Sequence, residues 1–103
     1  MLETQIHQNI IAALEKVEHP SIATTLINLG MLKNPQTTPE GKVSLTLVLP
    51  FPNIPDQIRD YMINSLAGAT QSVGGELTKV QLAVMNEEER QNFLTKEQQY
   101  WRG

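Results

Sequence analysis

Alternating apolar and polar residues mark the clearest strand of this chain, the string KVSLTLVL at residues 42–49. Every second residue from Val43 to Leu49 is valine or leucine, which is typical of a strand with one buried face. A second strand is predicted at residues 31–36, and the turn string TTPEG separates the two. We therefore expect an antiparallel hairpin with a loop longer than two residues.

Apolar residues recur at three- and four-residue intervals in residues 3–17 and after Asn53, which predicts two helices. Asn53 is expected to be the N-cap of the second helix, with Asp56 three residues later and Pro55 in the first turn. Residues 21–30 have weaker helical character and predict a short helical turn. The apolar stripes are formed by Ile6, Ile10, Ile11, Leu14 and Val17 in the first helix and by Ile54, Ile58, Met62 and Leu66 in the second.

A third strand and a polar helix are predicted in the last quarter of the chain. Residues 77–84 alternate, but the phase shifts around Lys79. Because a helix separates this strand from residues 42–49, the two strands should be parallel. Asn86 and Glu89 have the spacing of a capping box, so we expect a final helix. Its polar surface indicates docking by a few apolar anchors, or packing on another chain.

Together these elements predict an α+β fold, a small three-stranded mixed sheet with helices packed on it, in the order α-β-β-α-β-α. A length of 103 residues suits a single domain, 1–103, with 86–103 as a C-terminal helical extension. The apolar runs are too short to span a membrane, and the first ten residues lack the features of a signal peptide. We expect a cytoplasmic protein without membrane contact.

Charge and composition exclude several function classes. The net charge is −3 and the eight basic residues are scattered, which argues against nucleic-acid binding; RNA binding stays the weakest alternative. The absence of cysteine excludes disulfides, thiolate metal sites and cysteine nucleophiles. Two histidines and unmarked serines give no Ser-His-Asp pattern. We expect no enzymatic activity and no cofactor.

Three strings, ALEKVEHPSIATTLINLGMLKN, GKVSLTLVLPFPNIPDQI and LTKVQLAVM, occur in an order and spacing that resemble a known family. It is the small domain of the SufT and PaaD proteins, which is also the N-terminal domain of Mrp-type P-loop ATPases. The resemblance covers about residues 3–102. It implies this fold, a role in iron–sulfur cluster assembly, and partners that are iron–sulfur assembly proteins or a P-loop ATPase. A homodimer is a further expectation for this chain.

The chain departs from this family where the family carries its reactive groups. His19, followed by proline and serine, stands where the family usually has Asp-Pro-Glu. Pro50 matches the first proline of the Thr-x-Pro-x-Cys-Pro motif, but Pro52 takes the place of the cysteine and Asn53 that of the next proline. Because Pro52 has no thiol and no metal-binding side chain, the cluster chemistry implied by that cysteine cannot occur there.

The strand-to-helix turn VLPFPNIPDQI, residues 48–58, is the first candidate site. Free N–H groups at a helix start can face a ligand, and Phe51 would favour a protein or an apolar partner. The alternative is a corner stiffened by prolines, whose helix start is capped from within. His19 should lie nearby, as a metal ligand or base, or as an exposed loop histidine. The expected binding residues are His19, Pro50, Phe51, Pro52, Asn53 and Asp56.

The C-terminal aromatic residues are the second candidate site. Tyr100 and Trp101 are typical interface anchors and are expected to contact a partner; alternatively, Trp101 folds back onto the sheet.

Two other groups of residues, the methionines and a run of acids, have simpler interpretations. Three methionines should fill the core, and the consecutive acids 87–89 diverge around a helix, so no metal site is expected there. The three methionines are Met31, Met62 and Met85.

The function that these observations favour is that of a non-catalytic adaptor or accessory protein related to iron–sulfur cluster assembly, acting through protein contacts. The alternative is a small-ligand or metal-binding domain that uses His19, Asn53 and the turn.

Overall fold

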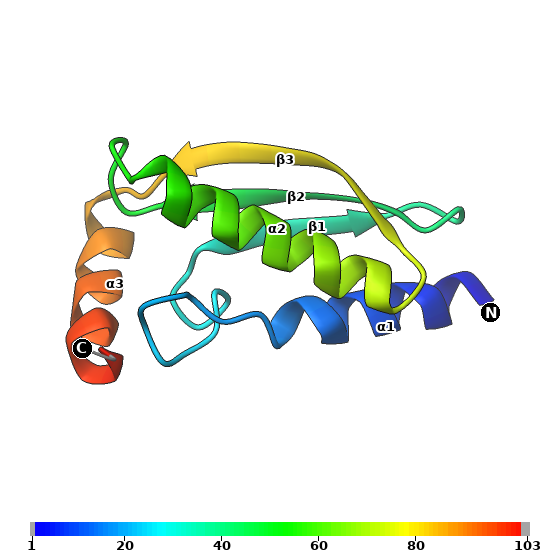
Figure 1. The fold of residues 1–103 in the computed structure, drawn as a ribbon, viewed down its shortest axis with the longest axis horizontal. Coiled ribbons are helices and arrows are strands. Elements are labelled where there is room, and N and C mark those ends of the chain that lie inside the picture. Colours follow the sequence, from blue (N-terminus) through cyan, green and yellow to red (C-terminus); the bar gives the residue numbers. More distant parts are fainter. Residues whose placement is uncertain (1, 102–103) are drawn as a thin grey trace.

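The computed structural model describes the backbone of residues 2–101 and the side chains of residues 7–101. Its elements follow the predicted order and confirm the α+β fold (Figure 1). The elements are α1 (Leu2–Glu15), β1 (Leu32–Thr37), β2 (Lys42–Leu49), α2 (Asp56–Ser72), β3 (Glu76–Val84) and α3 (Glu87–Tyr100). None of the helices in this described part is long and apolar enough to cross a membrane.

The three strands form one mixed sheet in the order β1-β2-β3. β1 and β2 pair antiparallel through the predicted hairpin, and β2 and β3 pair parallel around α2. The phase shift near Lys79 corresponds to an irregularity in the pairing. Val43 is opposite Leu77, whereas Ser44 is opposite Lys79, so Thr78 has no partner in the register. The alternation that predicted the strands therefore also located their bulge.

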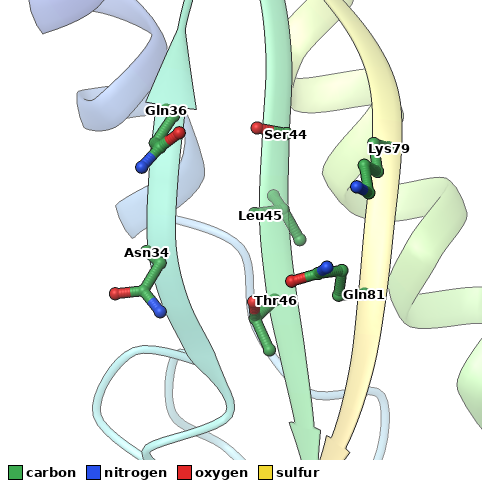
Figure 2. A pocket seen from close by; sticks show the side chains of 7 residues that line it. All are labelled: Asn34, Gln36, Ser44, Leu45, Thr46, Lys79 and Gln81. Carbon is green, nitrogen blue, oxygen red and sulfur yellow. The ribbon is translucent and has the colours of Figure 1, made fainter.

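Helices α1 and α2 cover one face of the sheet, and α3 lies across one end of it (Figure 1). The core fills the space between that face and the two helices, and it contains the alternate residues of β2 from Val43 to Leu49. The three predicted core methionines are buried, as expected. The opposite face of the sheet carries polar side chains and has no helix over it (Figure 2). The side chain of Ile6 lies outside the described side chains.

Close packing between α2 and β3 requires a glycine at position 75. A Cβ atom at this position would lie 2.9 Å from Thr70 Cγ2, 3.0 Å from Ile10 Cδ1 and 3.1 Å from the Gly41 carbonyl oxygen. Such distances are shorter than ordinary contacts, so only a residue without a Cβ lets α1, the end of α2 and the hairpin meet here.

One local prediction holds only in part, and another is wrong. Residues 21–30 form no regular helix, and an isolated bridge joins Glu18 and Thr25. The expected short helical turn is confined to the end of this segment, where the Leu29 N–H donates to the Thr25 carbonyl at 3.1 Å. The apolar residues Ile22 and Leu26 of this segment are buried. The second correction concerns α2, which begins at Asp56 rather than near Asn53.

Candidate functional site

An apolar pocket of about 250 Å³ lies where β2 passes into α2. Four parts of the chain enclose it: the loop after α1, the turn at residues 50–55, the first turns of α2, and α3. Met31, Met62 and Phe93 are buried in its wall, and Phe51 and Trp101 are exposed at it. The pocket therefore combines an inner apolar surface with aromatic residues that solvent can reach.

The turn that forms one wall is held by prolines and not by an N-cap side chain. Pro55 is the N-cap of α2, with φ −55° and ψ 138°, and no side chain caps the helix. The prediction that Asn53 caps α2 is therefore wrong. The Pro55 carbonyl accepts hydrogen bonds from the N–H groups of Ile58 and Arg59, both at 3.1 Å. The backbone of Pro55 is thus extended, as it is in residues outside a helix, and the N-cap lies two residues later than predicted.

Arg90 of α3 connects this turn to the end of the sheet. Its Nε donates to the Pro50 carbonyl at 2.8 Å, and a terminal nitrogen donates to the Met85 carbonyl at 3.1 Å. The other terminal nitrogen pairs with Glu87 at 2.9 Å. The guanidinium also lies 5.4 Å from the centroid of the Phe51 ring, in cation–π contact. One side chain therefore fixes both the proline turn and the aromatic ring at the pocket.

The start of α3, which carries Arg90, is stabilised by the predicted capping box. Asn86 Oδ1 accepts from the Glu89 N–H at 2.8 Å, and Glu89 Oε1 accepts from the Asn86 N–H at 3.0 Å. Glu89 also pairs with Lys33 of β1. The Lys33 ammonium, followed by the Asn86 N–H, holds the pKa of the Glu89 carboxyl below its usual value. These contacts fix where α3 begins and how it crosses the sheet end.

His19 brings a polar group to the pocket. Its side chain is only 9% exposed, so the expectation of an exposed loop histidine is wrong. The Ser21 N–H donates to His19 Nδ1 at 3.0 Å. An accepting Nδ1 places the proton of the neutral ring on Nε2. Ser21 and Glu97 are the other polar residues of the lining. The pocket is therefore apolar with a few polar groups, the usual composition of a binding site.

The structure gathers some of the predicted site residues and separates others. His19, Pro50 and Phe51 line the pocket together with Trp101. Pro52, Asn53 and Asp56 are exposed and are not part of the lining. Asp56 instead pairs with Arg59 at 3.3 Å.

The two C-terminal aromatic residues also differ in their positions. Trp101 lines the pocket but is 54% exposed, so it does not fold back as a cover for the core. Its backbone pairs with Ile22 in an isolated bridge. Tyr100 lies outside the lining, and its carbonyl accepts from the Ala23 N–H at 2.8 Å. These bonds bind the end of α3 to the loop after α1.

Three pocket residues were not predicted. Ser21 lies two residues from His19 but was not selected, whereas Phe93 and Glu97 join the lining because α3 crosses the end of the sheet beside residues 19–31. The spacing of Phe93 and Trp101 on one side of a polar helix was the available signal for α3. Glu97 had no such signal, because it looked like an interruption of that stripe.

The described residues provide no metal centre in or near this pocket. Among residues 7–101, no group of three or more His, Cys, Asp or Glu side chains could hold one ion. The second histidine, His7, is exposed on α1, and its Nδ1 is 2.7 Å from the Thr37 hydroxyl.

A second depression, of about 300 Å³, lies on the uncovered face of the sheet. Figure 2 shows its lining from all three strands, with Asn34 and Gln36 on β1, Ser44 and Thr46 on β2, and two residues of β3. Apart from Leu45 and Lys79, the lining residues carry uncharged amides or hydroxyls. A sheet face that no helix covers needs polar side chains toward solvent, so this depression is the weaker candidate.

Comparisons with known proteins agree with this fold. The chain resembles a crystallised domain of unknown function, DUF59, from Bacillus anthracis, with 17% identity, a TM-score of 0.56, and coverage of 90% of this chain and 92% of that one. At this identity the likeness concerns the fold alone. No curated protein matches the chain. A family model described as "Iron-sulfur cluster assembly protein" matches residues 7–77. This match covers the hairpin, the proline turn and α2, and the chain belongs to the iron–sulfur cluster assembly protein family.

Proposed function

We propose that this chain is a non-catalytic adaptor in iron–sulfur cluster assembly, which acts through protein contacts at the apolar pocket and holds no cluster at the turn. The observation that carries this proposal is the pocket between the proline turn and α3. It adjoins the position where the resemblance places a cysteine, and Pro52 stands at that position. The family relates the chain to cluster assembly, and the pocket supplies a means of acting without a thiol.

The size of the pocket supports a side chain as its occupant. Its volume of about 250 Å³ is smaller than the roughly 300–1,000 Å³ of typical small-molecule sites. One or two apolar side chains of a partner would fill it. Phe51 and Trp101, which are 39% and 54% exposed, would then cover these anchors and exclude water, as aromatic residues do at interface hot spots.

The polar residues of the lining would orient such an anchor. His19, Ser21 and Glu97 are the hydrogen-bonding groups at the pocket. Glu97 would favour a partner segment with a basic residue next to its apolar anchor. The proposed partners are iron–sulfur assembly proteins or a P-loop ATPase. A cytoplasmic location and the absence of catalysis and of nucleic-acid binding remain predictions.

Affinity purification from the native host tests this role, with Phe51→Ala as the perturbation. Tyr61→Ala on α2 is the matched control, because Tyr61 is also an exposed aromatic residue but lies outside the pocket lining. We expect wild type and Tyr61→Ala to recover the same iron–sulfur assembly proteins. Loss of an aromatic hot spot costs about 2 kcal/mol or more, so Phe51→Ala should reduce recovery at least about tenfold. Equal recovery with Phe51→Ala would contradict the proposal.

The alternative function is binding of a small ligand or a metal, and the burial of His19 beside the pocket is what favours it. Titration with divalent metal ions, followed by the histidine resonances, tests this alternative. Unchanged resonances of both histidines would count against metal binding.

A further inference from the structure

β3 is an edge strand of the sheet, and within residues 2–101 no other strand pairs with its outer side. In the order β1-β2-β3 it pairs with β2 alone. Figure 1 shows β3 along one margin of the sheet, while α3 runs away from that margin across the sheet end. Its nine residues make it the longest strand of the sheet.

One hydrogen bond at the end of β3 shows which of its backbone groups point away from β2. The Met85 N–H donates to the Leu49 carbonyl of β2 at 2.8 Å, so the polar groups of residue 85 face β2. Neighbouring residues of a strand direct these groups to opposite sides. The N–H and C=O groups of Val84, Leu82 and Val80 therefore face outward. Among residues 2–101, no hydrogen bond occupies these outward groups.

Apolar side chains accompany this open edge. Leu82 is 52% exposed and Val84 is 47% exposed. Leu82 is opposite Leu47 in the register, on the face of the sheet that α1 and α2 cover. Long edges with apolar side chains readily pair with another strand.

The other edge of the sheet is protected against such pairing. In β1, Pro35 has no N–H to donate, and Asn34 has a φ of 53°. The pairing of β1 with β2 is irregular between Lys33 and Gln36. Prolines and bulges are common means of protecting an edge. The fold therefore protects β1 and leaves β3 open, although the two edges belong to the same small sheet.

We propose that two copies of this chain associate through antiparallel pairing of β3 with β3, with Leu82 on the two-fold axis. In this register Leu82 is opposite the partner's Leu82, and Val80 and Val84 are opposite each other. The outward N–H and C=O groups of Val80, Leu82 and Val84 then bond to the partner strand, and each pair of opposite residues forms two N–H···O hydrogen bonds. The exposed apolar side chains of both copies also meet on one face. The proposal does not rest on the adaptor role, because β3 is separate from the pocket.

The charges of β3 are compatible with a second copy as the occupant. The strand carries one acid, Glu76, and one base, Lys79. In the proposed register Lys79 is opposite the partner's Met85, six positions from the partner's Lys79 and thus roughly 20 Å away along the strand. Within the paired strands, Lys79 therefore faces no like charge. Because the same residues meet from both sides, the surface is self-complementary, as a two-fold interface requires.

Single engineered cysteines test the register, since the natural chain has none. Residues opposite each other in a hydrogen-bonded pair have Cα atoms about 5.5 Å apart, which suits a disulfide. Leu82→Cys should therefore form a covalent dimer on mild oxidation. Val84→Cys should not, because the two cysteines would lie roughly 14 Å apart. Ile27→Cys, at another exposed apolar position, gives the background rate. Equal cross-linking of Leu82→Cys and Ile27→Cys, or of Leu82→Cys and Val84→Cys, would overturn the proposal.

Analytical ultracentrifugation over a dilution series tests the association itself. The wild type should approach 2 × 11.5 kDa at high concentration. Leu82→Lys should remain at the mass of one chain, and Ile27→Lys should behave as wild type. A wild type that stays monomeric, or a dimer that Leu82→Lys leaves intact, would overturn the proposal. If Leu82→Lys changes only the recovery of another protein, the edge accepts a foreign strand and the second copy is refuted as its occupant.

Discussion

Phe93→Ala is expected to release α3 from the domain while the sheet stays folded. Phe93 is 3% exposed and is the buried residue through which α3 reaches the core. Truncating a buried phenylalanine costs about 3–5 kcal/mol. Of the other contacts of α3, the Lys33–Glu89 pair and the bond from Lys96 Nζ to the Asn28 carbonyl are exposed and screened by solvent. The partly buried bonds from Arg90 to the Pro50 and Met85 carbonyls hold only the start of the helix, so they do not replace the lost packing.

Hydrogen exchange measures this release element by element. Since about 1.4 kcal/mol corresponds to a factor of ten, amides of α3 should exchange at least about 100-fold faster in Phe93→Ala. Amides of β2 should change much less, because α3 contributes little to the core between the sheet and α2. Asn92→Ala, an exposed position on the same helix, is the control and should match wild type. Equal acceleration in α3 and β2 would refute the view that α3 is a separately docked element.

Three further predictions concern the capping box and the glycines. Asn86→Ala removes the side-chain acceptor at the start of α3 and should lower the free energy of unfolding by about 1 kcal/mol in denaturant titrations. Gly75→Ala forces a Cβ into close contacts and should lower the free energy of unfolding by about 1–3 kcal/mol. A Cβ at Gly68 would meet nothing within 4 Å, so Gly68→Ala should stabilise α2 by about 0.5–1 kcal/mol. Thermal unfolding measures both effects, which have opposite signs. The folded-state pKa of Glu89 is lowered, so the ionised carboxylate stabilises the folded protein at neutral pH, and this stabilisation is lost as the pH falls below the usual pKa of 4.5. Unfolding measured as a function of pH should therefore show that the stability difference between wild type and Glu89→Gln disappears in acid. A difference that persisted in acid would refute the role of the Glu89 charge.

The regular elements could be predicted because their signals are local. The alternation from Val43 to Leu49 fixes the buried face of β2, and the phase shift near Lys79 shows where the register with β3 slips. The capping box of Asn86 and Glu89 is a signal within four residues, and it is confirmed by both hydrogen bonds. In each case neighbouring residues decide the structure, so the sequence pattern is sufficient.

The failed local predictions share one cause, which is that contacts from elsewhere in the chain decide the conformation. Ile22 and Leu26 have helical spacing, but the loop carrying them pairs with the backbone at Val17 and Trp101. Those bonds replace the hydrogen bonds of a helix. At the start of α2, Asn53 has the chemistry of an N-cap, but Pro55 keeps the backbone extended beyond it. In residues 21–30 and at the start of α2, the local conformational preference of the sequence was therefore overridden by these other constraints.

The candidate site could be predicted only in part. The proline turn and its neighbour His19 were recognised, but the pocket is completed by Phe93, Glu97 and Trp101 of the C-terminal segment. Residues 19 and 101 are brought together by the crossing of α3 over the sheet end, and no periodicity encodes that crossing. His19 lines the same pocket and is buried, and no pattern in the sequence near it indicated that burial.

Anaerobic reconstitution with iron and sulfide tests the central claim most directly, which is that this family member acts without holding a cluster at the turn. Iron and sulfide should be counted on the isolated chain after gel filtration, together with the absorption and Mössbauer spectra. The account predicts no stoichiometric cluster, because Pro52 stands where the resemblance places the cysteine and the chain contains no thiol. A stable cluster at a fixed ratio to the chain would contradict it.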